Sequence, residues 1–188
     1  MPLVDIINNF NKSTRLPIFA EQVRQAILAD GGASRINIFN RTWNFERIVG
    51  FCNIKKYGDD KIINIYYRSD LSPEERRVVL VKEMLHVYDK EEHINIDEAI
   101  LNAVESAQLP RDAATIYINP DDLDGRMLIP ALAILVPEHL RNRCRELYDR
   151  GELDIDDVTR ITGIPRKYKF VILREDFEDN LNDIIRSL

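Results

Sequence analysis

Residues 72–90 read SPEERRVVLVKEMLHVYDK, and this stretch combines a strong helix start with an unusually apolar body. Ser72 can cap the first free amides, Pro73 suits the first helical position, and Glu75 completes an S-x-x-E capping box. The apolar residues that follow are Val78, Val79, Leu80, Val81, Met84, Leu85 and Val87. Because a helix this apolar on all sides is normally buried, we expect a central helix over 72–90 with the rest of the chain packed around it.

Three polar side chains interrupt the apolar stretch, and their spacing suggests a degenerate metal motif. Lys82 and His86 are four residues apart and share a helix face, and Glu83 lies one turn before His86. With histidine at position 82 the segment would read H-E-x-x-H, in which two imidazoles bind zinc and the glutamate is the general base. An amine therefore stands where the first imidazole is expected.

Composition and charge favour a globular protein outside the membrane. Hydrophobic residues make up 45% of the 188, charged residues 31%, and the formal net charge of -6 argues against a general nucleic-acid or anionic-membrane binder. Cys52 and Cys144 are far apart and form no C-x-x-C pair, which favours buried thiols. No apolar run approaches the ~20 residues that span a bilayer, and residues 1–10 lack signal-peptide features. We expect a cytoplasmic protein.

The order of predicted elements indicates an α+β fold that is rich in helices. Strands are predicted at 35–40, 47–55 and 61–68, the last two as a hairpin around residues 58–60. Helices are predicted at 2–11, 17–30, 72–90, 95–108, 121–135 with a kink or break at Pro130, 137–150, 154–162, 165–174 and 175–188. We therefore expect a small early three-stranded sheet packed on the central helix, followed by a C-terminal helical part with a helix-turn-helix-like pair.

Three segments in this order resemble the ImmA/IrrE family of metallopeptidase-like proteins. They are RRVVLVKEMLH at 76–86, ALAILVP at 131–137 and VTRITGIPRKYKFVIL at 158–173, and the resemblance spans residues 16–173. It implies a zincin-like domain, here residues 1–136, with a C-terminal helical region, residues 137–188, packed on it as one compact unit.

The resemblance also implies a zinc peptidase with two histidine ligands, a glutamate base and a third, acidic ligand. Glu83 matches the base and His86 the second histidine, whereas Lys82 replaces the first. The third-ligand position falls near Arg126, with aspartates at 121, 122 and 124 close by, so Asp124 is the candidate ligand if a metal is bound.

Two physical arrangements remain open for this site. In the first, which we favour, the Lys82 ammonium replaces the metal charge and pairs with Glu83 or with an aspartate of 121–124, because a protonated amine has no lone pair for zinc. In the second, a metal binds through another set drawn from His86, Asp89, Glu92 and His93, although seven helical residues separate the two histidines by ~10 Å. Plainer interpretations are a solvated Lys82–Glu83 pair and a His86 that is simply a core or rim histidine.

The C-terminal helix pair raises a separate hypothesis of DNA binding. Arg166, Lys167 and Lys169 on the predicted second helix could meet phosphates. The first helix opens with acidic residues at 154, 156 and 157, and we therefore favour packing over DNA contact.

These observations lead to three functional hypotheses. The first is a metallopeptidase-like protein with a degenerate zinc site, without cofactor or catalysis, that acts by binding a protein such as a repressor-type regulator in a bacterial or phage setting. The second is an active zinc-dependent endopeptidase with an atypical ligand set. The third is a DNA-binding regulator that uses the C-terminal helix pair.

Overall fold

The computed structural model describes residues 2–42, 49–89 and 126–188, and it confirms a helix-rich α+β fold with a three-stranded sheet early in the chain. The elements are α1 (Leu3–Asn11), α2 (Ala20–Ala29), β1 (Arg35–Arg41), β2 (Gly50–Tyr57), β3 (Asp60–Arg68), α3 (Pro73–Leu85), the 3-10 helix η1 (His86–Tyr88), α6 (Leu128–Leu135), α7 (Glu138–Asp149), α8 (Ile155–Thr162), the 3-10 helix η4 (Arg166–Tyr168), α9 (Lys169–Ile172) and α10 (Phe177–Ser187). The helix predicted at 95–108 lies outside the described residues.

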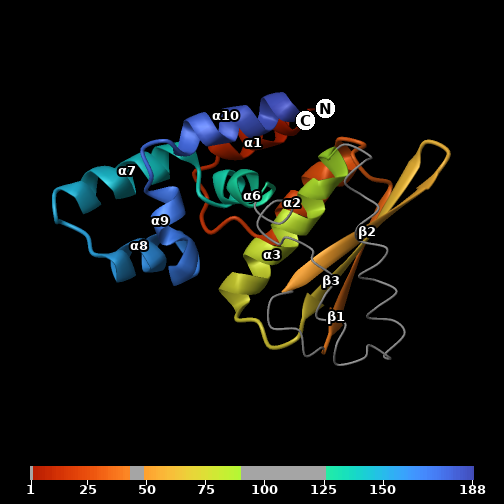
Figure 1. Ribbon diagram of the computed structural model, residues 1–188, viewed down its shortest axis with the longest axis horizontal. Helices are drawn as coiled ribbons and strands as arrows, with labels where there is room; N and C mark the ends of the chain where they lie inside the picture. Colours follow the sequence, from red (N-terminus) through yellow and green to blue (C-terminus); the bar gives the residue numbers. More distant parts are fainter. Residues whose placement is uncertain (1, 43–48, 90–125) are drawn as a thin grey trace, which may run out of the picture.

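Helix α3 starts as its sequence predicts and lies at the centre of the molecule (Figure 1). The amide of Glu75 donates to Ser72 Oγ at 3.2 Å, and the Glu75 carboxylate accepts from the Ser72 amide, which completes the capping box. All eight residues from 78 to 85 are buried. The helix ends at Leu85 and continues as η1, so the expected single helix to residue 90 is wrong beyond that point.

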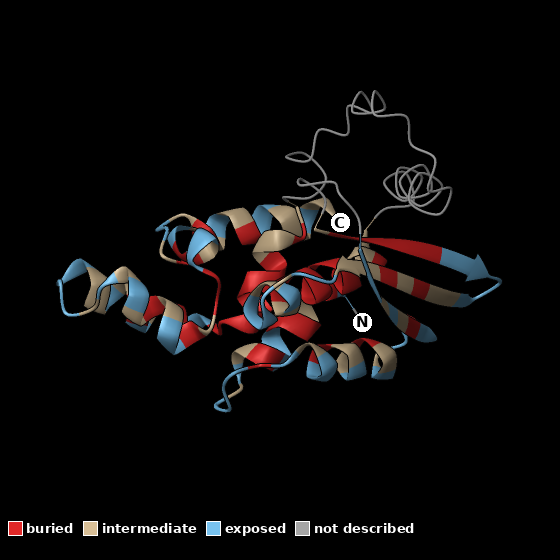
Figure 2. Cartoon of the chain, turned by 90° about the horizontal axis from the view of Figure 1, so that it is seen from below, coloured by how far each residue is buried: buried red, intermediate tan, exposed pale blue. Residues whose placement is uncertain are grey.

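The sheet has the order β1-β3-β2 and packs on α3 through β2 and β3, as expected. β1 runs parallel to β3, and β2 is antiparallel to β3 across a hairpin in which Gly58 adopts a φ of +62°. The hairpin projects beyond the helices (Figures 1 and 2). Helix α2 contacts both β1 and α3. A Cβ atom at Gly50 would collide with the Val79 side chain, so this glycine lets α3 approach β2 closely.

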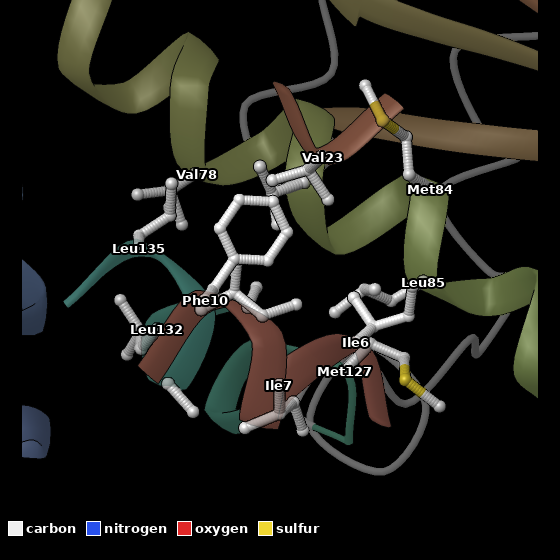
Figure 3. Packing of buried hydrophobic residues seen from close by; sticks show 14 of the residues in the cluster. Ile6, Ile7, Phe10, Val23, Val78, Met84, Leu85, Met127, Leu132 and Leu135 are labelled. Carbon is white, nitrogen blue, oxygen red and sulfur yellow. The ribbon is translucent and has the colours of Figure 1, made fainter. Parts of the chain in front are cut away.

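The main core lies where α1 and α6 meet α3. Figure 3 shows Ile6 and Phe10 of α1 packed among Leu132 of α6 and Val78 of α3, all of them buried. Helix α6 begins at Leu128, so Pro130 is its third residue. There the missing N–H removes no intrahelical hydrogen bond, and the helix continues unbroken through Pro130 to Leu135.

The C-terminal helices α7, α8 and α9 lie at the opposite end of the molecule from the sheet, whereas α10 returns to pack on α6 (Figures 1 and 2). The division of the chain at residue 136 stays a prediction. Both cysteines are buried, as expected, and burial raises the pKa of the Cys144 thiol. Within 2–42, 49–89 and 126–188, no helix is long and apolar enough to cross a membrane.

Arg141 joins three C-terminal elements although it is fully buried. Its Nη1 donates to the carbonyl oxygens of Ala133, at 3.1 Å, and of Val136, and its Nη2 donates to the Glu178 carboxylate at 2.6 Å. The guanidinium also lies over the Phe177 ring, 4.5 Å from its centroid. Burial lowers the pKa of Arg141, while the contact with Glu178 opposes that shift. This side chain holds α7 and α10 against the end of α6.

We expect Arg141→Ala to lower the free energy of unfolding by about 3–5 kcal/mol, because it leaves two carbonyl groups unpaired and removes the partner of Glu178. Arg143→Ala on the same helix is the matched control. Arg143 forms an exposed ion pair with Glu146 at 3.4 Å, and exposed pairs contribute little. Its loss should therefore change the free energy of unfolding by less than about 0.5 kcal/mol. Urea unfolding followed by circular dichroism measures both. Equal effects would contradict the role assigned to Arg141.

Candidate functional site

Lys82 and Glu83 form an ion pair inside the protein. Lys82 Nζ lies 2.8 Å from Glu83 Oε1, and the two side chains are 4% and 3% exposed. The interpretation of a solvated surface pair is therefore wrong. Adjacent helix residues ordinarily point in different directions, so this contact requires both long side chains to turn toward one point. Burial of two charges is tolerated here because each supplies the counter-charge of the other.

His86 and Asp89 extend this pair at the end of α3. His86 Nδ1 lies 2.7 Å from Asp89 Oδ2, and His86 Nε2 lies 3.8 Å from Glu83 Oε2. The His86 side chain is 18% exposed, whereas that of Asp89 is 6% exposed and its Oδ1 has no hydrogen-bond partner among the described residues. We call Lys82, Glu83, His86 and Asp89 the α3 polar cluster. His86 has the most exposed side chain of the four, so it is a rim rather than a core histidine.

The turn into η1 produces the contact between His86 and Asp89. His86 follows the last residue of α3, and its change to 3-10 geometry brings the side chain three residues later alongside the imidazole. Tyr88 holds the same turn, because its hydroxyl donates a hydrogen bond to Asp30 at 3.1 Å. Burial raises the pKa of this hydroxyl. The sequence identified Asp89 only as a ligand of the alternative metal set. The H-x-x-D spacing was the available signal for this contact.

The described part of the site does not fit a zinc ion. A catalytic zinc site needs three protein ligands, but an amine paired with Glu83 stands at the first-ligand position. The contact of His86 Nδ1 with Asp89 leaves only Nε2 of that ring as a possible ligand. In the described part of the chain, no three His, Cys, Asp or Glu side chains are grouped so that they could hold a metal ion. Arg126, near the implied third-ligand position, donates to Oγ and the carbonyl oxygen of Ser187 at 2.6 and 3.2 Å.

Several candidate ligands lie outside the described residues. They are Asp124 with its neighbours at 121 and 122, and Glu92 and His93 of the alternative set. Because α3 ends at Leu85, the helical spacing no longer separates His86 from His93. The possible roles of Asp124 and His93 therefore stay predictions.

The basic residues of the C-terminal helix pair each have a protein contact. Lys167 Nζ lies 2.9 Å from Glu75 Oε1, and this hydrogen bond lowers the pKa of Glu75. Arg166 Nε lies 3.5 Å from the Asp156 carboxylate in an exposed pair. Lys169 is only 4% exposed, burial lowers its pKa, and its Nζ lies 5.1 Å from the ring centroid of Phe170. Lys167 and Lys169 therefore take part in packing within the protein.

The predicted second helix of this pair is shorter than expected. Residues 165–174 form η4 and the four-residue α9 rather than one continuous helix. The first helix is as expected, with Asp154 as its N-cap and Gly163 at a φ of +64° as its C-cap. Arg77 of α3 binds this C-cap, because its Nη2 donates to the carbonyl oxygens of Thr162 and Gly163 at 3.1 and 2.6 Å. Burial lowers the pKa of Arg77.

Comparison with known proteins adds no family assignment. No protein-family model matches the chain, and a search of curated proteins finds no match. The resemblance to the ImmA/IrrE family therefore stays a prediction based on the three sequence segments.

We expect Lys82→Met to lower the free energy of unfolding by about 3–5 kcal/mol, since Glu83 would be left as a buried charge without its cation. The double variant Lys82→Met/Glu83→Leu removes both charges and should recover most of that loss. Arg76→Met, at an exposed position of the same helix, is the control and should have little effect. Chemical denaturation of the four proteins tests this. If Lys82→Met proved as stable as Arg76→Met, the pair would not stabilise the fold.

A second prediction concerns the contact between α3 and α8. Gly163→Ala places a Cβ atom 2.8 Å from Arg77 Nη2 and forces alanine into a positive-φ conformation. Gly151→Ala has the same backbone strain, with φ of +70°, but no atom within 4 Å. We expect Gly151→Ala to cost about 1 kcal/mol of unfolding free energy and Gly163→Ala clearly more. Thermal unfolding compares the two. Identical losses would mean that the Arg77 contact contributes nothing.

Proposed function

We propose that this chain is a zincin-like protein in which an internal ion pair has replaced the catalytic zinc, and that it acts by binding another protein. The observation that carries the proposal is the 2.8 Å contact between Lys82 Nζ and Glu83 Oε1, with both side chains buried. It puts a cation where the H-E-x-x-H pattern has its first ligand. The resemblance suggests a repressor-type regulator as the partner.

The surroundings of Glu83 argue against its use as a general base. A base must reach a water molecule or substrate group through a hydrogen bond. The Glu83 side chain is 3% exposed, its Oε1 faces Lys82, and its Oε2 faces the ring of His86. A carboxylate held in this way is the counter-charge of Lys82 and a neighbour of His86. The cluster is therefore better suited to stabilise the end of α3 than to transfer protons.

A binding role is also consistent with the surface of the described residues. Phe19, Tyr57 and Phe170 are 58%, 62% and 61% exposed, and each lies on a different part of the fold. Such side chains are common contributors to protein interfaces. The alternative of DNA binding gains little support, because Lys167 and Lys169 are engaged within the protein.

Metal content tests the proposal. We expect the purified chain, loaded with excess zinc and then dialysed, to retain well under one zinc ion by plasma mass spectrometry. Lys82→His adds an imidazole four residues before His86 and should increase retention, whereas Lys82→Met removes the amine without adding a ligand and should not. Retention of one zinc ion by the unaltered chain, with its loss in His86→Ala, would contradict the proposal and favour the endopeptidase with an atypical ligand set.

A further inference from the structure

β1 is an edge strand of the described sheet, and its register shows which of its backbone groups face outward. The Arg41 carbonyl accepts a hydrogen bond from the Ser69 amide at 2.9 Å, so Arg41 directs its backbone groups toward β3. In a parallel pair alternate residues face the neighbouring strand. Ile36, Ile38 and Asn40 therefore direct their N–H and C=O groups away from the sheet.

Arginines cap the two ends of this edge and leave its centre open. Arg24 Nε donates to the Ile36 carbonyl at 3.3 Å, and Arg41 Nη1 donates to the Asn40 carbonyl at 3.1 Å. Among the described residues, none bonds to the outward N–H and C=O of Ile38. Unpaired groups on an edge strand form a template on which another strand can pair.

The side chains of β1 specify what such a strand would carry. Ile36 and Ile38 point to the helix side of the sheet, where Ile38 is 38% exposed. Arg35 and Arg41 are exposed on the other face, on either side of a half-buried Phe39. A strand alongside β1 would place apolar side chains next to Ile38 on one face and carboxylates next to the two arginines on the other.

We propose that the β1 edge binds an extended segment of a partner protein in which apolar and acidic residues alternate. The inference rests on the proposed binding function and specifies the partner chemistry. The surface is distinct from the α3 polar cluster, because Glu83 lies near Gly50 of β2, at the opposite edge of the sheet. A second copy of the chain fits poorly, since antiparallel pairing of two β1 strands about Ile38 sets Arg35 against Arg41.

The probe is a fluorescein-labelled, end-blocked peptide that alternates valine and glutamate, with a valine–lysine peptide as its counterpart. Fluorescence anisotropy should show that the unaltered chain binds the glutamate peptide and not the lysine peptide. Ile38→Pro should weaken binding about tenfold, because it removes the outward amide while the β1–β3 hydrogen bonds remain. Ile38→Val keeps the amide and should bind as the unaltered chain does. Arg35→Glu/Arg41→Glu should abolish binding and does not depend on how proline is tolerated.

Several results would overturn the inference. They are no binding of the glutamate peptide, equal binding of the lysine peptide, or affinities that are the same in Ile38→Val, Ile38→Pro and Arg35→Glu/Arg41→Glu. Self-association that Ile38→Pro abolishes would assign the edge to a second copy, and displacement of the peptide by single-stranded DNA would assign it to nucleic acid. Zinc retention reports separately on the proposed function, because a zinc-bound chain could still bind the peptide and a zinc-free chain could fail to do so.

Discussion

Two opposite charges lie side by side in the buried half of the central helix α3, and the structure depends on their pairing. Lys82 and Glu83 come from the middle of a stretch in which eight consecutive residues are buried. Either charge alone would cost several kcal/mol in such surroundings. As a pair, each charge offsets part of the cost of burying the other, so both can stay buried where α3 packs against the sheet and α6.

Charged side chains also join the C-terminal helices to α3. Arg77 and Lys167 connect the first turns of α3 to α8 and η4, through backbone carbonyls in one case and the Glu75 carboxylate in the other. Both contacts join residues more than 80 positions apart in the chain. Lys167, a candidate phosphate contact in the sequence, thus serves as a link between helices.

Local sequence signals predicted the elements well, but contacts between distant residues set several of their limits. The capping box placed the start of α3 correctly, and Gly58 marked the hairpin. The end of α3 was missed because the apolar pattern continues through Val87, while the contact of His86 with Asp89 and the turn into η1 are tertiary features. The parallel pairing of β1 with β3 has no local signature. For the site around Lys82, the sequence left open an ion pair or a metal bound by another ligand set. The spacing of residues along the helix does not distinguish the two.

The pairing of β1 has a consequence for the order in which the sheet assembles. β2 and β3 meet across a tight turn, whereas each partner of β1 on β3 lies 27 positions away along the chain. Closing a loop of that length costs more chain entropy than closing a hairpin, and within the described sheet β1 pairs with β3 alone. The antiparallel pair can therefore form early and recruit β1 late, so that during fluctuations of the native protein this strand should detach before the other two separate.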